Sequence, residues 1–121
     1  MNNYSCEYLV ISCIDFRIHV LVHTWLREKF PQKQYDYAAF AGGVNDLSLA
    51  TEQIEISKRL HSIKRLILIE HEDCGAYGKE GTREEQIQDL KDARTAASKL
   101  YPDLSIDLLY LSVSGVFQEV S

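Results

Sequence analysis

Apolar and polar residues follow two patterns that alternate along the chain. Short continuous apolar runs have the length of β-strands, and the longer stretches between them repeat apolar residues at the spacing of an α-helix. The most hydrophobic run, Leu66–Ile69, is typical of a strand covered by helices on both faces. The patterns predict strands over residues 8–13, 35–41, 66–69 and 106–111, and helices over residues 18–30, from Asn45 or Asp46 to about Ser62, and from about 83 to 100.

This alternation predicts an α/β fold with a doubly wound, mainly parallel sheet of about four strands flanked by helices and joined by right-handed crossovers. In such sheets ligands bind outside the carboxyl ends of the strands, where the strand order reverses. The loops after the first and third predicted strands are therefore the places to expect a site. They hold the two densest groups of chemically capable side chains, in residues 13–17 and 71–75.

Length and charge restrict the classes of partner. A chain of 121 residues predicts a single domain over residues 1–121, and its net charge of −5 argues against nucleic acid or an anionic membrane as a partner. No apolar run is long enough to span a membrane, and the start of the chain lacks the pattern of a secretory signal. Three cysteines are too few and odd in number for a disulfide framework, so we expect reduced thiols and a cytoplasmic protein.

Three residues in the two loops have the side chains that zinc prefers. Cys13, His71 and Cys74 offer two thiolates and an imidazole, and three protein ligands leave a fourth position for water or a carboxylate. His71 and Cys74 lie three residues apart, so one tight turn can direct both into one cavity. Taken separately, each motif also fits a purely structural role, in which the cysteine is a small buried apolar residue and the histidine is a hydrogen-bonded polar residue.

Asp15 and Arg17 add a second element to the first loop. Asp15 lies two residues after Cys13, so an extended backbone would direct both side chains into the same cavity, and Arg17 can hold the Asp15 carboxylate by a bidentate pair. Asp15 could then accept a hydrogen bond from water on the metal or, released from Arg17, become a fourth ligand that closes the site. The alternative is a surface ion pair of little consequence.

These motifs resemble those of the β-class carbonic anhydrases. The C-x-D-x-R segment of that family is present as residues 13–17, and its H-x-x-C-G segment as residues 71–75. Ala41-Gly42-Gly43 is similar to the end of the family's R-N-A-G-G segment. The resemblance covers roughly residues 8–110, and both motifs occur in the expected order at predicted strand ends.

The resemblance implies a lyase with one Zn²⁺ per chain that interconverts carbon dioxide and bicarbonate by means of a zinc-bound hydroxide. Family members assemble with partner subunits, so the resemblance also implies a homodimer or a larger homo-oligomer. The implied roles are zinc ligand for Cys13, His71 and Cys74, catalytic dyad for Asp15 and Arg17, and substrate-side loop for Gly42 and Gly43.

The sequence also departs from the family pattern. Ala39 and Phe40 replace the usual Arg-Asn, Phe16 stands where many members have a serine, and the first strand is predicted close to the first residue, where family members have N-terminal helices. Phe16 and Phe40 either line an apolar substrate cavity or belong to the core, and the core interpretation is favoured. Cys6 has no partner in the sequence pattern and is interpreted as a free thiol.

These departures leave two alternatives to carbonic anhydrase activity. One is a related zinc hydrolase that acts on another small linear molecule, such as carbonyl sulfide or carbon disulfide. The other is a non-catalytic domain that zinc stabilises, in which Asp15 completes a closed four-coordinate site.

Overall fold

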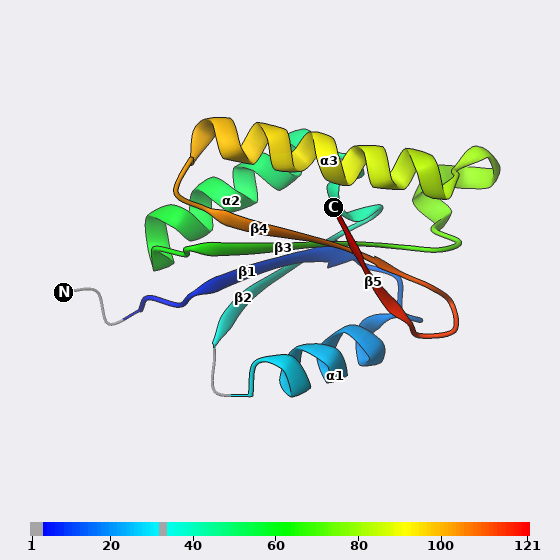
Figure 1. Ribbon diagram of the computed structural model, residues 1–121, viewed down its shortest axis with the longest axis horizontal. Helices are drawn as coiled ribbons and strands as arrows, with labels where there is room; N and C mark the ends of the chain where they lie inside the picture. Colours follow the sequence, from blue (N-terminus) through cyan, green and yellow to red (C-terminus); the bar gives the residue numbers. More distant parts are fainter. Residues whose placement is uncertain (1–3, 32–33) are drawn as a thin grey trace.

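The structure of the protein is a computed structural model that describes residues 4–31 and 34–121 (Figure 1). Among these residues, no helix is long and apolar enough to cross a membrane. The elements follow in the order β1 (Tyr8–Cys13), α1 (His19–Lys29), β2 (Tyr35–Phe40), the 3-10 helix η1 (Gly43–Asn45), α2 (Leu47–His61), β3 (Arg65–His71), the 3-10 helix η2 (Gly75–Glu80), α3 (Arg83–Leu100), β4 (Ser105–Leu111) and β5 (Phe117–Val120).

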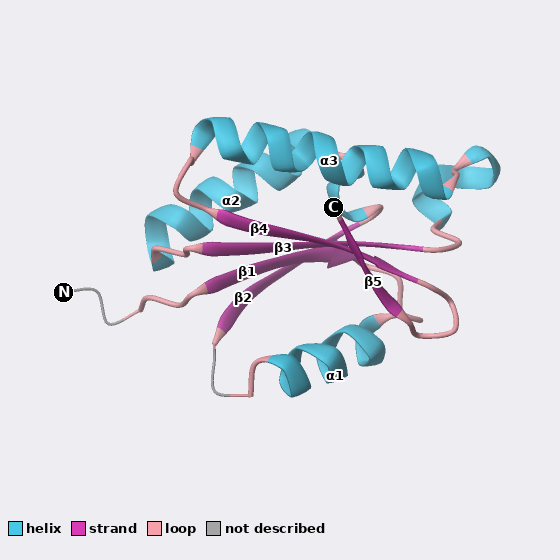
Figure 2. Cartoon of the chain, in the orientation of Figure 1, coloured by secondary structure: helices cyan, strands magenta, loops and turns pink. Residues whose placement is uncertain are grey.

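The strands form one sheet in the order β2-β1-β3-β4-β5, in which the first four strands are parallel. Helices α2 and α3 cover one face, and α1 lies on the other (Figure 1 and Figure 2). The predicted α/β class and the predicted sheet with helices on both faces are confirmed. The most hydrophobic strand, β3, lies in the middle of the sheet and is buried over its last six residues.

The sequence pattern did not predict the fifth strand. Strand β5 has four residues, is nowhere fully buried, and pairs antiparallel with β4 at the edge of the sheet. A tight turn returns the chain to β4, because the Ser112 N–H donates to the Val116 carbonyl and Gly115 takes a left-handed conformation with φ 91°. A half-exposed edge strand with polar residues in the middle has no continuous apolar run by which to be recognised.

Two of the helices begin at side-chain caps. The Asp46 carboxylate accepts a hydrogen bond from the Leu49 N–H at the start of α2. The Thr82 hydroxyl oxygen likewise accepts from the Glu85 N–H at the start of α3. Each cap satisfies one of the amide groups that a helix leaves unpaired at its start.

The sheet topology creates the crevice that holds the site. β1 is paired with β2 on one side and with β3 on the other, and the connections to these neighbours run over opposite faces of the sheet. The strand order therefore reverses at β1, which opens a crevice at the carboxyl ends of β1 and β3. Cys13 and His71 are the last residues of these two strands.

Candidate metal centre

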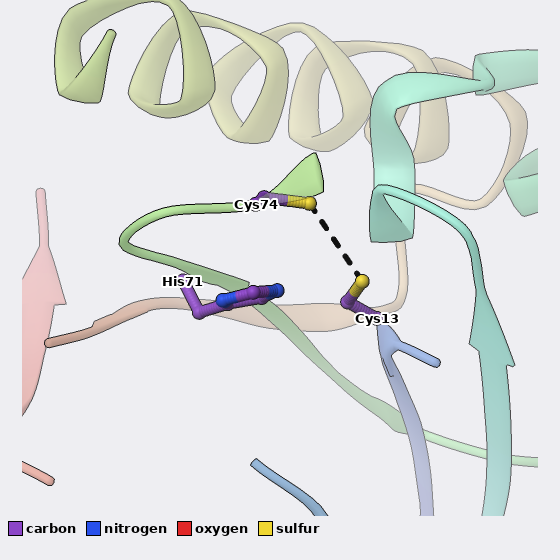
Figure 3. Close-up of side chains that lie close together, drawn as sticks. All are labelled: Cys13, His71 and Cys74. Atoms are coloured by element: carbon purple, nitrogen blue, oxygen red, sulfur yellow. Dashed lines mark hydrogen bonds between the residues drawn. The ribbon is translucent and has the colours of Figure 1, made fainter. Parts of the chain in front are cut away.

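Cys13, His71 and Cys74 converge in this crevice (Figure 3). All three side chains are buried, and their possible ligand atoms lie within 4.8 Å of one another. The two sulfur atoms are 3.7 Å apart. The structure thus brings together the three residues that the sequence suggested as ligands, from two strand ends and the loop after β3.

The His71 ring is oriented as a metal ligand needs to be. Its Nδ1 lies 2.9 Å from the backbone carbonyl of Glu72, which accepts a hydrogen bond from it. The other nitrogen, Nε2, is buried and has no hydrogen-bond partner among the described residues. Since Nδ1 carries the proton, Nε2 presents a lone pair toward the sulfur atoms. Two sulfurs and this nitrogen fit a zinc ion with three protein ligands.

The two thiols differ in how readily they ionise. Burial opposes ionisation of Cys13, but the His71 imidazole and the Gly42 N–H, which donates to Cys13 Sγ over 3.4 Å, lower its pKa to about 7. Burial and the neighbouring Cys13 raise the pKa of Cys74 to about 11. Two adjacent thiolates therefore need a cation between them, which a divalent metal provides.

Arg17 fixes the carboxylate of Asp15 beside the three donors. The guanidinium donates to Asp15 Oδ2 at 2.5 Å and to Oδ1 at 3.0 Å, and the Arg17 backbone N–H donates to Oδ1 at 2.9 Å. These hydrogen bonds hold the pKa of the Asp15 carboxyl well below its usual range. Asp15 Oδ2 lies 3.8 Å from His71 Nε2. The ionised Asp15 carboxylate is thus held beside the possible metal ligand His71.

Asp73 holds Arg17 from the other loop, a contact that the sequence did not indicate. The Arg17 Nη1 donates to the Asp73 carboxylate at 3.1 Å, and Nη2 donates to the Asp73 backbone carbonyl at 2.8 Å. Asp73 has a left-handed backbone with φ 61°. The two loops are therefore joined through one guanidinium group.

A cleft of about 610 Å³ opens at Cys13 and at the Asp15–Arg17 pair. Phe16 lies at its mouth with 83% of its surface exposed, so the core interpretation of Phe16 is wrong. Phe40 is half-buried and packs against the core beneath α2 and α3, as that interpretation expected. Gly42 lines the cleft, whereas Gly43 is buried against Glu70. The lining residues are Cys13, Ile14, Asp15, Phe16, Arg17, Ala41, Gly42, Asp73, Gly75 and Ala76.

A buried polar cluster next to the site was also missed in the sequence. Glu70 is fully buried, and its Oε2 lies 2.8 Å from the hydroxyl of Tyr77. The same hydroxyl lies 2.5 Å from Asp89 Oδ2. Burial raises the pKa of Glu70 to about 9. An acidic residue directly after the apolar run 66–69 was the signal that could have found it.

A family model described as "Putative carbonic anhydrase" matches residues 4–121. An uncharacterized protein of Rickettsia bellii is 26% identical in an alignment 133 positions long, and the match covers 93% of this chain and 80% of that protein. A carbonic anhydrase from Streptococcus mutans has a similar structure, with a TM-score of 0.73 and 16% identity over all of this chain and 86% of the other.

A carbon disulfide hydrolase also shares the fold, with a TM-score of 0.60 and 14% identity over 98% of this chain and 79% of the other. Identities this low show the fold alone. The family model, in contrast, covers nearly the whole chain. This chain therefore belongs to the carbonic anhydrase family that the model describes, and it has the fold of the β-class carbonic anhydrases.

Proposed function

We propose that the protein is a zinc-dependent lyase that interconverts carbon dioxide and bicarbonate, with Cys13, His71 and Cys74 as the ligands of one Zn²⁺ per chain. The observation that carries this proposal is the Asp15 carboxylate, which Arg17 fixes 3.8 Å from the His71 Nε2. Zinc in such a site lowers the pKa of a bound water, so that a hydroxide nucleophile is available near neutral pH. Family membership supports the same activity.

Asp15 and Arg17 act as a dyad in this proposal. Because its pKa is held low, Asp15 stays ionised and can accept a hydrogen bond from the attacking water, which orients a lone pair of that water toward the substrate carbon. Arg17 keeps the carboxylate in place by a bidentate pair. Ile14, Phe16 and Ala41 give the cleft apolar walls, which suit a small uncharged substrate.

Several broader properties belong to the same proposal. We expect residues 1–121 to act as one zinc-binding domain. We also expect a cytoplasmic protein, because all three cysteines are free thiols and thiols stay reduced in that compartment. Ile14 and Phe16 are exposed apolar side chains that line the cleft, and Val20 in α1 is an exposed apolar side chain as well. Exposed apolar surface of this kind supports a homodimer or a larger homo-oligomer.

The proposal is tested by stopped-flow carbon dioxide hydration on protein of known zinc content. Wild type should hydrate carbon dioxide rapidly, and Asp15→Asn should lose at least about tenfold in rate while it keeps its zinc. Cys74→Ser should lose both zinc and activity. Asp103→Asn, which removes an exposed carboxylate paired with Lys58, serves as the control and should match wild type.

Two results would overturn this function. Full zinc occupancy without carbon dioxide hydration would leave carbonyl sulfide or carbon disulfide as the substrates to test. No turnover of any of the three, with spectroscopy of the cobalt-substituted protein showing Asp15 as a fourth ligand, would identify a closed, non-catalytic site.

A further inference from the structure

A second cluster of metal-binding side chains lies at the opposite end of the parallel strands, where β1 and β2 begin. Cys6 precedes β1, Asp36 is the second residue of β2, and His61 is the last residue of α2. One possible ligand atom from each lies within 4.8 Å of the others. The cluster lies at the amino ends of β1 and β2, whereas Cys13 lies at the carboxyl end of β1. The two groups of donors are therefore separated by the length of a strand, roughly 20 Å.

Three chain segments meet at this cluster through contacts of the fold. β1 and β2 run parallel, with Leu9 paired to Asp36, so the residues just before β1 lie beside the start of β2. The Cys6 N–H donates to the His61 backbone carbonyl at 3.0 Å, which ties the segment before β1 to the end of α2. The His61 Nδ1 lies 2.7 Å and 2.9 Å from the two oxygens of Asp36.

The donors have the chemistry of a zinc ligand set. A thiolate, an imidazole nitrogen and a carboxylate oxygen are each zinc ligands, and the two negative groups balance the charge of a divalent cation. The side chains of His61 and Asp36 are 34% and 23% exposed, so an ion can reach them. His61 also ends α2, where the helix dipole favours positive charge. A cavity of about 250 Å³ beside the cluster leaves room for a water ligand.

The same contacts argue against Cys6 as a nucleophile. Its thiol lies 3.5 Å from the Tyr8 carbonyl, which accepts a hydrogen bond from it, and burial and the Asp36 carboxylate raise its pKa. A reactive cysteine needs a lowered pKa, and this one has the opposite environment.

We propose that Cys6, Asp36 and His61 form a second metal site, which binds Zn²⁺ or a similar divalent cation with water in the remaining position. The ion would join the segment before β1 to β2 and α2, and so stabilise the edge of the fold that lies far from the catalytic cleft. Metal binding at this edge does not depend on the ligands proposed for the catalytic zinc.

The test measures zinc stoichiometry on the full chain, at free zinc concentrations set by a competing chelator. Wild type should bind two equivalents, and Cys6→Ser and Asp36→Asn should each bind one. Loss of a direct ligand should weaken the second site by more than the ~10–100-fold that loss of a ligand's hydrogen-bond partner costs. Asp103→Asn, the matched carboxylate control, should still bind two. In the cobalt-substituted protein, Cys6→Ser should remove only part of the thiolate-to-metal absorption.

The outcomes separate this inference from the proposed function. If wild type binds one equivalent and Cys74→Ser removes it, the second site is wrong and the catalytic ligand set stands. If wild type binds two and Cys6→Ser removes one without loss of carbon dioxide hydration, the second site is established. Circular dichroism of the variants checks that they are folded, and His61→Gln provides a further variant should Cys6→Ser not fold.

Discussion

At the scale of single residues, hydrogen bonds from Arg17 position the Asp15 carboxylate. Its guanidinium binds the Asp15 carboxylate on one side and both the carboxylate and the backbone carbonyl of Asp73 on the other. Five donors in a planar fork make these contacts possible together, and the single ammonium group of a lysine cannot reproduce them. The position of Asp15 is thus a property of three residues from two loops.

We expect Arg17→Lys to lower the rate of carbon dioxide hydration by roughly 10–100-fold, because a small displacement of a positioning group costs about that much. Zinc content should not change, since Arg17 offers no ligand atom to the metal. Stopped-flow kinetics and metal analysis on the same sample measure both quantities. An unchanged rate would mean that the carboxylate is positioned without the guanidinium.

Glu70 carries a proton at neutral pH for a reason visible in its contacts. The Tyr77 hydroxyl has one proton but lies within hydrogen-bond distance of both Glu70 and Asp89. Two hydrogen bonds need a second proton, and the fully buried Glu70 carboxyl is the group that retains one. The cluster is therefore a chain of hydrogen bonds from the buried end of β3 toward α3.

Glu70→Gln should stabilise the metal-free chain at neutral pH, by about 3 kcal/mol at pH 7. Burial raises the pKa of Glu70 from 4.5 to about 9, so between these values the unfolded chain has lost a proton that the folded chain retains. The stability of wild type therefore falls as pH rises through this window, and glutamine removes that dependence. Urea unfolding at pH 5 and pH 8 measures the difference, with the exposed Glu55→Gln as control.

At the scale of elements, the turn between β2 and α2 needs glycine for two reasons. Gly42 and Gly43 have φ values of 78° and 60°, which residues other than glycine rarely adopt. A Cβ on Gly43 would also lie 2.6 Å from Glu70 Oε1. The turn is thus fitted to the buried carboxyl of β3, and it also places the Gly42 N–H on Cys13 Sγ.

Gly43→Ala should lower the free energy of unfolding by about 1–2 kcal/mol from the left-handed backbone alone, and by more from the clash with Glu70. The double variant Gly43→Ala with Glu70→Ala separates the two causes, because it removes the clash and leaves the backbone cost. Urea denaturation of the two single variants and the double variant measures the coupling. Strictly additive effects would show that the clash is absorbed elsewhere.

At the scale of the whole molecule, apolar side chains gather around the open end of the cleft. Ile14 and Phe16 line it, and Val20 is the second residue of α1; all three are exposed. Exposed apolar side chains beside a site are typical of surfaces that another subunit covers. Association of two copies through this face would also shield the cleft from bulk water.

Sedimentation velocity should therefore find a dimer or a larger assembly of the wild-type chain at micromolar concentration. Phe16→Asp places a charge in the apolar surface and should shift the distribution toward monomer, because burying an unpaired charge is costly. Leu100→Asp, on an exposed site at the end of α3, is the matched control. A wild-type monomer would argue against association through this surface.

The sequence by itself determined the order of the four parallel strands and the three α-helices, and the positions of the motifs on them. Hydrophobic periodicity located β1 and α3 within a residue or so, because it follows directly from backbone geometry. The capping side chains of Asn45 and Asp46 located the start of α2 in the same way. The spacing of Cys13, Asp15 and Arg17 is local, so their proximity could be inferred. The pairing rules of parallel sheets then placed the Cys13 and His71 strand ends at one edge.

Only the tertiary structure decided the contacts between side chains far apart in the sequence. It placed Asp73 on Arg17, joined Glu70 to Asp89 through Tyr77, and brought Cys6 to Asp36 and His61. It also added β5 and exposed Phe16. These features depend on how helices and strands pack and which rotamers that packing allows, and such information is not contained in the period of a local pattern.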